Sequence, residues 1–176
     1  MKTTLIALCV VAALTGCKSD ADKAAEAAAQ QAIQKRATEA ATALCAGDVD
    51  AFTSSYMTEE AGNDFGKAVA EAFDDGYKEA HPILGRAAGA MSQKRKLQLI
   101  KGHVAKAGAV ICTLESVQLQ SLSGDRAKVS INVRVKASAK TLTTKWESST
   151  GTWLISDADD VEKQAAERVR VAASKS

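Results

Sequence analysis

Apolar residues recur at helical spacing through the first part of the chain. Residues 21–46 are rich in the strongest helix formers, Ala, Gln, Glu and Lys, and Gly47 closes the segment. Its second half has one apolar face, made of Ile33, Ala37, Ala40 and Leu44. The first half has no large apolar residue, so we expect residues 17–32 to form either a projecting helical stalk or a flexible tether.

Two capping residues predict the next helices. Asp48 can cap a short helix whose apolar face carries Val49, Phe52 and Tyr56. Thr58 can cap a longer helix, which we expect Asp74-Asp75-Gly76 to end. The apolar stripe of the longer helix consists of Phe65, Val69, Ala72 and Phe73.

A further helix is predicted after the break at His81-Pro82. Helical periodicity resumes over residues 86–107 and ends near Gly108. Its apolar positions are Ala90, Leu97, Ile100 and Val104.

The repeat then changes to that of a β-strand. Residues 110–119 alternate between faces, with a shift in phase before Val117 that indicates a β-bulge. Gly124-Asp125 turns the chain into the clearest strand, whose buried face is expected to carry Val129, Ile131, Val133 and Val135. A third strand presents Leu142, Thr144 and Trp146, and residues 152–156 form a fourth.

The order of these elements predicts an α+β fold. Consecutive strands joined by short turns form an antiparallel meander, and helices that precede such a sheet pack on one of its faces. Residues 157–160 offer carboxylates that can cap a last helix over residues 161–173. We therefore expect N-terminal helices packed on a curved four-stranded antiparallel meander, with a C-terminal helix within residues 158–176.

Composition narrows the class of protein without indicating an activity. The 176 residues are enough for one domain, and the single proline and two histidines exclude proline-rich and histidine-rich metal-binding proteins. The net charge of +2 lacks the basic excess of a dedicated nucleic-acid-binding protein. We expect no nucleic-acid partner, and the oligomeric state stays open.

The first residues have the pattern of a secretory signal. Lys2 precedes the apolar run of residues 5–14, which is shorter than the about 20 residues that a membrane-spanning helix needs. The segment Leu14-Thr15-Gly16-Cys17 resembles the lipobox of bacterial lipoproteins. That resemblance implies that residues 1–16 are a signal peptide, cleaved directly before an acylated Cys17. An ordinary secreted protein is the alternative.

The residue after the lipobox cysteine bears on the location. Lys18, rather than an aspartate, occupies this position. In the enterobacterial sorting pattern this resembles delivery to the outer membrane. The resemblance therefore implies a lipid-anchored envelope protein that faces the periplasm.

Two further cysteines follow the lipobox. Cys45 and Cys112 form an even pair in an oxidising compartment. We expect them either to form a disulfide bond or to pack as separate buried thiols, and the sequence leaves both arrangements open.

Three short motifs resemble the nuclear-transport-factor-2-like superfamily, in particular its small bacterial lipoprotein members. They are Gly47-Asp48 with Phe52 and Tyr56, Gly124-Asp125-x-Ala127-x-Val129, and Gly151-x-Trp153-x-Ile155. The resemblance covers roughly residues 33–157 and implies a sheet curved into a cone around the helices. The alanine-rich stalk and the charged last helix lie outside that minimal fold.

No combination of residues indicates catalysis. The enzymes of the ketosteroid-isomerase type in that superfamily need a carboxylate base and oxyanion donors inside an apolar pocket. Single residues could serve as a catalytic group, namely Glu115, Tyr56 or Tyr77. A solvent-facing or edge position explains each of them more simply.

Metal binding is equally unsupported by the sequence. His81 and His103 lack a neighbouring ligand at metal-binding spacing. Asp157, Asp159 and Asp160 lack the glycine and closing glutamate of a calcium loop, and a helix cap explains them. We expect no cofactor and no metal.

Two other clusters admit a functional interpretation. Lys94-Arg95-Lys96 could contact an anionic surface, but we expect a solvated helix face. Trp146 and Trp153 could form a binding platform, but we expect both to fill the core.

These features together predict a membrane-anchored, non-catalytic module of the bacterial envelope. We expect it to bind a ligand or a protein, with an envelope protein or a small apolar molecule as the partner. The alternatives are a small-molecule enzyme that uses the cone cavity and a structural protein that oligomerises through its stalk and last helix.

Overall fold

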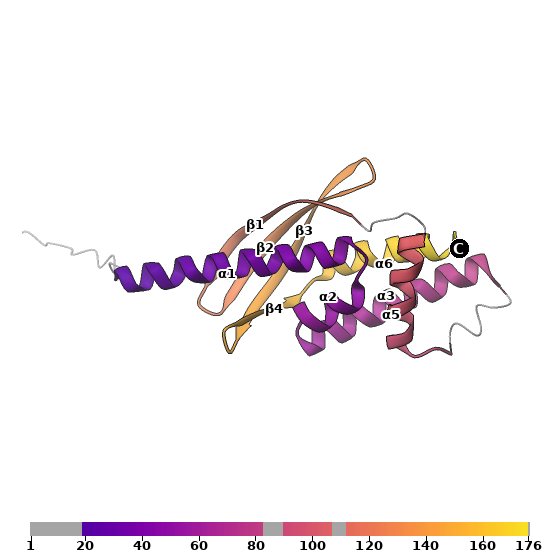
Figure 1. The fold of residues 1–176 in the computed structure, drawn as a ribbon, viewed down its shortest axis with the longest axis horizontal. Coiled ribbons are helices and arrows are strands. Elements are labelled where there is room, and N and C mark those ends of the chain that lie inside the picture. The colour runs from indigo at the N-terminus through magenta and orange to yellow at the C-terminus, as the bar shows by residue number, and fades with distance from the viewer. Residues whose placement is uncertain (1–18, 83–89, 107–111, 176) are drawn as a thin grey trace, which may run out of the picture.

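The fold has two layers, a sheet and a set of helices on one of its faces (Figure 1). The computed structural model describes residues 19–82, 90–106 and 112–175, with the backbone alone at 103–106. Within these ranges the helices α1 Asp20–Cys45, α2 Val49–Tyr56, α3 Glu59–Ala80 and α5 Gln93–Lys106 come first. The strands β1 Thr113–Ser123, β2 Arg126–Val135, β3 Ser138–Ser149 and β4 Thr152–Asp157 follow, and α6 Asp159–Ala173 ends the fold. The predicted α+β class is confirmed.

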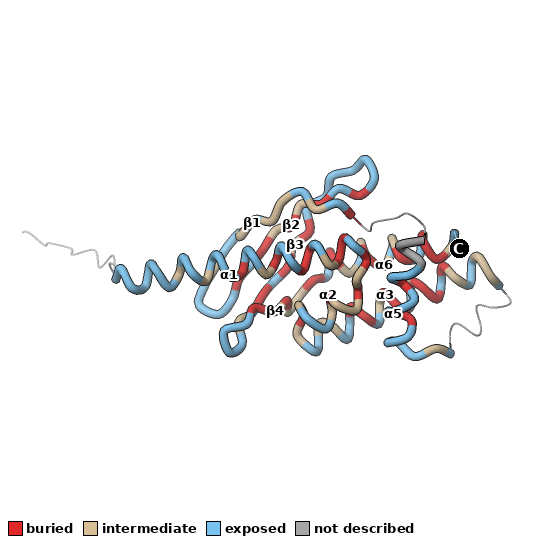
Figure 2. The backbone as a smooth tube through the Cα atoms, in the orientation of Figure 1, coloured by how far each residue is buried: buried red, intermediate tan, exposed pale blue. Residues whose placement is uncertain are grey.

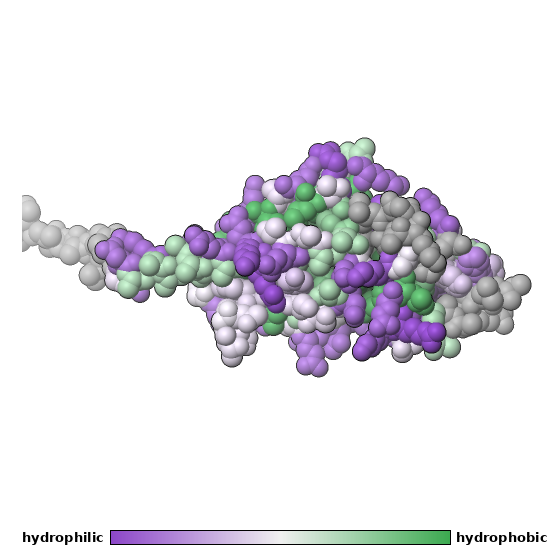
Figure 3. Space-filling model, viewed as in Figure 1, coloured by the Kyte–Doolittle hydropathy of each residue, from purple (hydrophilic) through white to green (hydrophobic). Residues whose placement is uncertain are grey.

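Helix α1 is continuous from Asp20, so residues 20–32 form the predicted helical stalk and not the flexible tether. Residues 17 and 18 lie outside the described residues. A capping box starts the helix, because the N–H of Ser19 donates to the Asp22 carboxylate and the N–H of Asp22 donates to the Ser19 hydroxyl, both at 3.1 Å. Figure 1 shows this end projecting beyond the sheet, and Figure 3 shows hydrophilic and weakly hydrophobic side chains on it. From Ile33 onward the apolar face is buried.

The sheet is the predicted antiparallel meander, in the order β1-β2-β3-β4. The predicted inward-facing residues of β2 are buried, namely Val129, Ile131, Val133 and Val135. In β1 the register with β2 shifts after Leu114 and again after Leu119, which leaves Glu115 and Gln120 without a direct partner. The predicted bulge is confirmed, and the strand contains a second one.

Helix α3 is longer than predicted. It does not end at Asp74-Asp75-Gly76 but continues to Ala80, and His81 is its C-cap. Gly76 lies buried in the helix interior, because a Cβ there would collide with the carbonyl oxygen of Arg170 on α6. This glycine therefore serves close packing of two helices and does not end one.

Helix α5 is shorter than predicted. It begins at Gln93 rather than at residue 86, and Ala90 lies exposed in the turn before it. Leu97 and Ile100 are buried, as predicted. The predictions for Val104, Gly108, Val110 and Ile111 concern side chains or residues outside the described part of the chain.

The core lies between the helices and the inner face of the sheet (Figure 2). Its largest fully buried side chains include Trp146, Phe52, Phe65 and Phe73. The indole N–H of Trp146 donates to the Thr144 hydroxyl at 2.7 Å, so the polar atom of this buried ring has a partner. Trp153 is also buried, and both tryptophans fill the core as predicted.

A disulfide bond joins Cys45, the last residue of α1, to Cys112, directly before β1. Their Cα atoms lie 4.5 Å apart, and 67 positions of sequence separate them. Of the two arrangements that the sequence leaves open, this is the bridged one. The bond ties the long helix to the first strand of the sheet.

Candidate functional site

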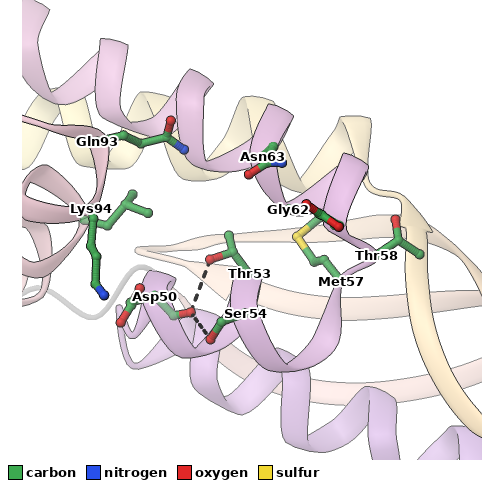
Figure 4. A pocket seen from close by; sticks show the side chains of 11 residues that line it. Asp50, Thr53, Ser54, Met57, Thr58, Gly62, Asn63, Gln93 and Lys94 are labelled. Carbon is green, nitrogen blue, oxygen red and sulfur yellow. Dashed lines mark hydrogen bonds between the residues drawn. The ribbon is translucent and has the colours of Figure 1, made fainter.

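A cleft of about 540 Å³ opens between α2, α3 and α5. Figure 4 shows its side chains, which come from all three helices and from the turn that joins α2 to α3. Its polar lining residues are Asp50, Thr53, Ser54, Thr58, Glu59, Asn63, Gln93 and Lys94, and its large apolar ones are Met57 and Leu97. This helical cleft is the candidate binding site.

Helix caps position the first wall of the helical cleft. Asp48 is the N-cap of α2 and accepts a hydrogen bond from the N–H of Ala51 at 3.4 Å. Thr58 is the N-cap of α3 and accepts from the N–H of Ala61 at 3.3 Å. The N–H of Thr58 donates to the carbonyl of Ile155 on β4 at 2.9 Å. Both predicted caps are confirmed, and the turn between the two helices is tied to the sheet.

Two glycines of α3 allow the walls to approach each other. A Cβ on Gly62 would lie 3.0 Å from the carbonyl oxygen of Thr53, so the missing side chain lets α3 pack closely on α2. A Cβ on Gly66 would lie 2.6 Å from Nε2 of Gln93, so this glycine leaves room for the amide. Glycine inside a helix is less favourable than alanine by about 1 kcal/mol. Contact with the α2 backbone accounts for Gly62, whereas at Gly66 the neighbour is the end of the flexible Gln93 side chain.

Two ion pairs hold α5 against the other helices. Nζ of Lys96 lies 2.5 Å from Oδ2 of Asp74 on α3, with side chains only 10% and 12% exposed. Nζ of Lys101 lies 2.6 Å from Oδ2 of Asp48, beside α2. The hydrogen bond from Lys101 lowers the pKa of the Asp48 carboxyl below its ordinary value. The second wall of the helical cleft is thereby fixed by charge as well as by apolar contact.

The prediction of a solvated face for Lys94-Arg95-Lys96 is wrong for one of its three residues. Lys96 is buried, since α5 crosses α3 with this side inward and Asp74 supplies the opposite charge. Lys94 lines the helical cleft, and Arg95 is exposed. The basic run therefore divides between a buried contact, the cleft and solvent.

The chemistry of the helical cleft suits non-covalent recognition. The hydroxyls of Thr53 and Ser54 donate to the carbonyl oxygen of Asp50 at 3.2 and 2.7 Å, so both hydroxyl protons are held by the backbone (Figure 4). The remaining polar lining groups are the Thr58 hydroxyl, carboxylates, amides and the Lys94 ammonium. They offer hydrogen-bond donors, acceptors and both signs of charge over an apolar floor, which is the usual composition of a polar ligand site.

The residues considered singly for catalysis lie on separate elements. Glu115 is exposed at the bulge of β1 and forms an ion pair with Arg134 on β2. Tyr56, at the end of α2, lies beneath the guanidinium of Arg36, which is 4.6 Å from the ring centroid. Each of the two residues thus contacts a cation on a neighbouring element, and the two lie on different elements, β1 and α2.

Tyr77 lies in an aromatic row near the end of α3. Its ring centroid is 5.9 Å from that of Phe73 and 4.8 Å from that of His81. His81 is thus the C-cap of α3 and contacts the ring of Tyr77. The side chain of His103 lies outside the described residues, and so do the predicted cleavage and acylation residues Gly16 and Cys17.

The predicted side-chain cap of the last helix is wrong, because Asp157 lies one residue before the N-cap position and the helix already begins at Asp159. Asp157 accepts from the N–H of Asp159 at 3.3 Å and forms an ion pair with Lys145 on β3. That hydrogen bond from Lys145 lowers the pKa of the Asp157 carboxyl. The N-cap itself is Ala158, which has no capping side chain.

Within residues 19–82, 90–106 and 112–175, no three His, Cys, Asp or Glu side chains are placed to hold a metal ion. None of the helices in these same ranges combines the length and the apolar character that a membrane span requires. Comparison with family models, curated proteins and solved structures found no match for this chain.

The sequence did not single out most residues of the helical cleft. Asp50, Asn63 and Gln93 belong to three helices and form no motif along the chain. The only local signal is a short helix rich in hydroxyl side chains, followed directly by the acidic start of α3. The way in which three helices pack decides that these residues meet.

Proposed function

We propose that this protein is a lipoprotein of the bacterial envelope, anchored through an acylated Cys17, whose folded part is a non-catalytic binding module. The helical cleft carries the binding role, because it presents both signs of charge, amides and an apolar floor without an activated nucleophile. The ligand class that this lining fits is a polar segment of an envelope protein with both donors and acceptors.

The anchor is supported by the lipobox resemblance at residues 14–17 and by the helix that follows it. Ser19 is the N-cap of α1, so an acyl group on Cys17 would attach three positions before Asp20, the first residue of a long helix whose first half is exposed. Such a helix would separate the binding module from the bilayer as a stalk. The Lys18 that follows favours the outer membrane, with the module facing the periplasm.

The proposed kinship with the nuclear-transport-factor-2-like superfamily is supported by the glycines of its three motifs. Gly47, Gly124 and Gly151 all have positive φ values, of 79°, 59° and 81°. Glycine adopts this conformation without strain. The turn in each motif therefore explains why glycine occupies that position.

Replacement of the lipobox cysteine tests the anchor. Cys17→Ser should abolish labelling of the protein by radioactive palmitate and should prevent cleavage of the leader, because the thiol accepts the lipid. Cys9→Ser, a matched change inside the leader, should retain the label. Label that persists in Cys17→Ser would contradict the proposed anchor.

Site-specific photocrosslinking tests the binding role. A photoreactive residue placed at Asn63 in the helical cleft should give a discrete adduct in living cells. The same residue at Glu71, exposed on the same helix outside the cleft, should not give this adduct. Identical products from both positions would contradict recognition by the cleft.

A further inference from the structure

The outer face of the sheet is polar and carries an excess of cations. The described helices pack on the other face, where the alternate residues of β2 are buried. The outward residues of β2 are Arg126, Lys128, Ser130, Asn132 and Arg134, without a carboxylate among them. The outer side of β2 therefore offers cations and neutral hydrogen-bonding groups to a partner. The neighbouring strands add three carboxylates, of which Glu115 pairs with Arg134, Asp157 pairs with Lys145, and Glu147 lies opposite Arg126.

Strand register sets two rows of side chains side by side on this face. One row crosses three strands as Ser121, Lys128 and Lys145. The next row, nearer the turns, is Ser123, Arg126 and Glu147. Both rows, together with Ser156, line a hollow of about 370 Å³, which we name the sheet hollow.

The charges of the sheet hollow are incompletely compensated. Lys145 forms an ion pair with Asp157. Arg126 lies opposite Glu147 but, like Lys128, has no ion pair with any described residue. Lys128 lies directly opposite Lys145, and like charges in that position destabilise a sheet. An anion bound between them would relieve this repulsion.

We propose that the sheet hollow binds phosphate groups of an anionic lipid surface. The guanidinium of Arg126 can donate two parallel hydrogen bonds to a phosphate, and Lys128 adds a point charge. The hydroxyls of Ser121 and Ser123 stand in the same two rows and can donate as well.

The position of the sheet hollow favours the membrane as the source of the phosphate. The turns at residues 124–125 and 150–151 lie at the end of the sheet where α1 begins (Figure 1). Asp22 and Glu26 of α1 line a common surface pocket with Leu122 and Gly124, which places the start of the helix beside the β1–β2 turn. The choice of the membrane rests on the proposed anchor at Cys17, since that anchor would hold this end near the bilayer.

Vesicle flotation of the full chain carrying Cys17→Ser tests the proposal independently of acylation. Binding is compared between vesicles of phosphatidylcholine and vesicles that also contain phosphatidylglycerol, so that any contribution of the retained leader appears in both. The double variant Arg126→Gln with Lys128→Gln should lose about tenfold or more of its preference for anionic vesicles. The matched pair Lys67→Gln with Lys78→Gln on α3 removes the same charge and should change it less than about twofold.

Folding is checked on the same samples. The Arg126 and Lys128 side chains are exposed, and removal of the Lys128–Lys145 repulsion should leave the melting temperature equal or higher. If the double variant does not fold, Lys128→Gln alone should still lower the anionic preference about threefold or more.

Three results would overturn the proposal. The first is equal binding to neutral and anionic vesicles, and the second is an equal loss in the sheet and α3 variants, which would reflect net charge alone. The third is saturable binding of inorganic phosphate by itself, lost in the sheet variant, with no preference for anionic vesicles. Palmitate labelling of Cys17 reports separately on the anchor, so its failure is distinguishable from failure of the sheet hollow.

Discussion

At the scale of single residues, a close contact between α3 and α6 depends on the missing side chain of Gly76. A Cβ on Gly76 would collide with the carbonyl oxygen of Arg170 and lie 2.9 Å from its carbonyl carbon and 3.0 Å from Cβ of Ala173. Gly102 on α5 is different, since a Cβ there would meet no atom of the described residues within 4 Å. Both glycines lie inside helices, but Gly76 is closely packed against α6 whereas Gly102 has open space beside it.

Alanine at these two positions should change stability in opposite directions. Gly76→Ala should lower the free energy of unfolding by about 1–3 kcal/mol, because overpacking outweighs the gain of about 1 kcal/mol in helix propensity. Gly102→Ala should raise it by up to about 1 kcal/mol. Urea denaturation of both variants measures the difference, and stabilisation by Gly76→Ala would show that α6 can move away without loss.

At the scale of elements, the start of α6 concentrates negative charge beside α3. Burial raises the pKa of the Glu162 carboxyl above its ordinary value of 4.5, and the charges of Asp159 and Asp64 raise it further. Ionised Glu162 is therefore less favourable in the folded than in the unfolded protein. Stability falls as pH rises from about 4.5 through the raised pKa.

Glu162→Gln should remove this part of the pH dependence. The variant should be more stable than the wild type at about pH 7 and equal to it at about pH 3, where the carboxyl is protonated in both states. Asp159 and Asp160 remain at the N-terminus of α6 and preserve its favourable helix-dipole interaction. Urea denaturation at both pH values measures the effect, and an equal difference at the two would attribute it to packing.

At the scale of the whole molecule, the Cys45–Cys112 disulfide cross-links the helical layer to the sheet. The segment between Cys45 and Cys112 contains α2, α3 and α5, so the disulfide closes a loop around the entire helical cleft. Its removal leaves the folded contacts in place but enlarges the conformational freedom of the unfolded chain.

Cys45→Ala combined with Cys112→Ala should lower the free energy of unfolding by about 2–4 kcal/mol. A reducing agent should bring the wild type to the stability of the double variant and should leave the variant unchanged. Urea denaturation with and without reductant measures both effects. A wild type insensitive to reductant would contradict the stabilising role of the bond.

Local patterns predicted most elements because each depends on neighbours along the chain. The caps at Asp48 and Thr58 need only a side-chain oxygen next to a helical repeat, and the alternation in β2 needs only one buried face. Two predictions that were wrong, a helix end and an exposed lysine, depend on residues remote in sequence. Gly76 ends no helix because α6 packs on it, and Lys96 is buried because Asp74 is there to receive it.

The amino-acid sequence by itself determined the α+β order, the antiparallel meander, the filling of the core by tryptophan and the pattern on which the proposed anchor rests, since these follow from repeats and short motifs. Only the tertiary structure decided the helical cleft, the pairing of Cys45 with Cys112 and the rows of the sheet hollow. Each of these joins residues far apart in sequence, and their meeting depends on how helices cross and on how strands align. A local pattern contains no information on either.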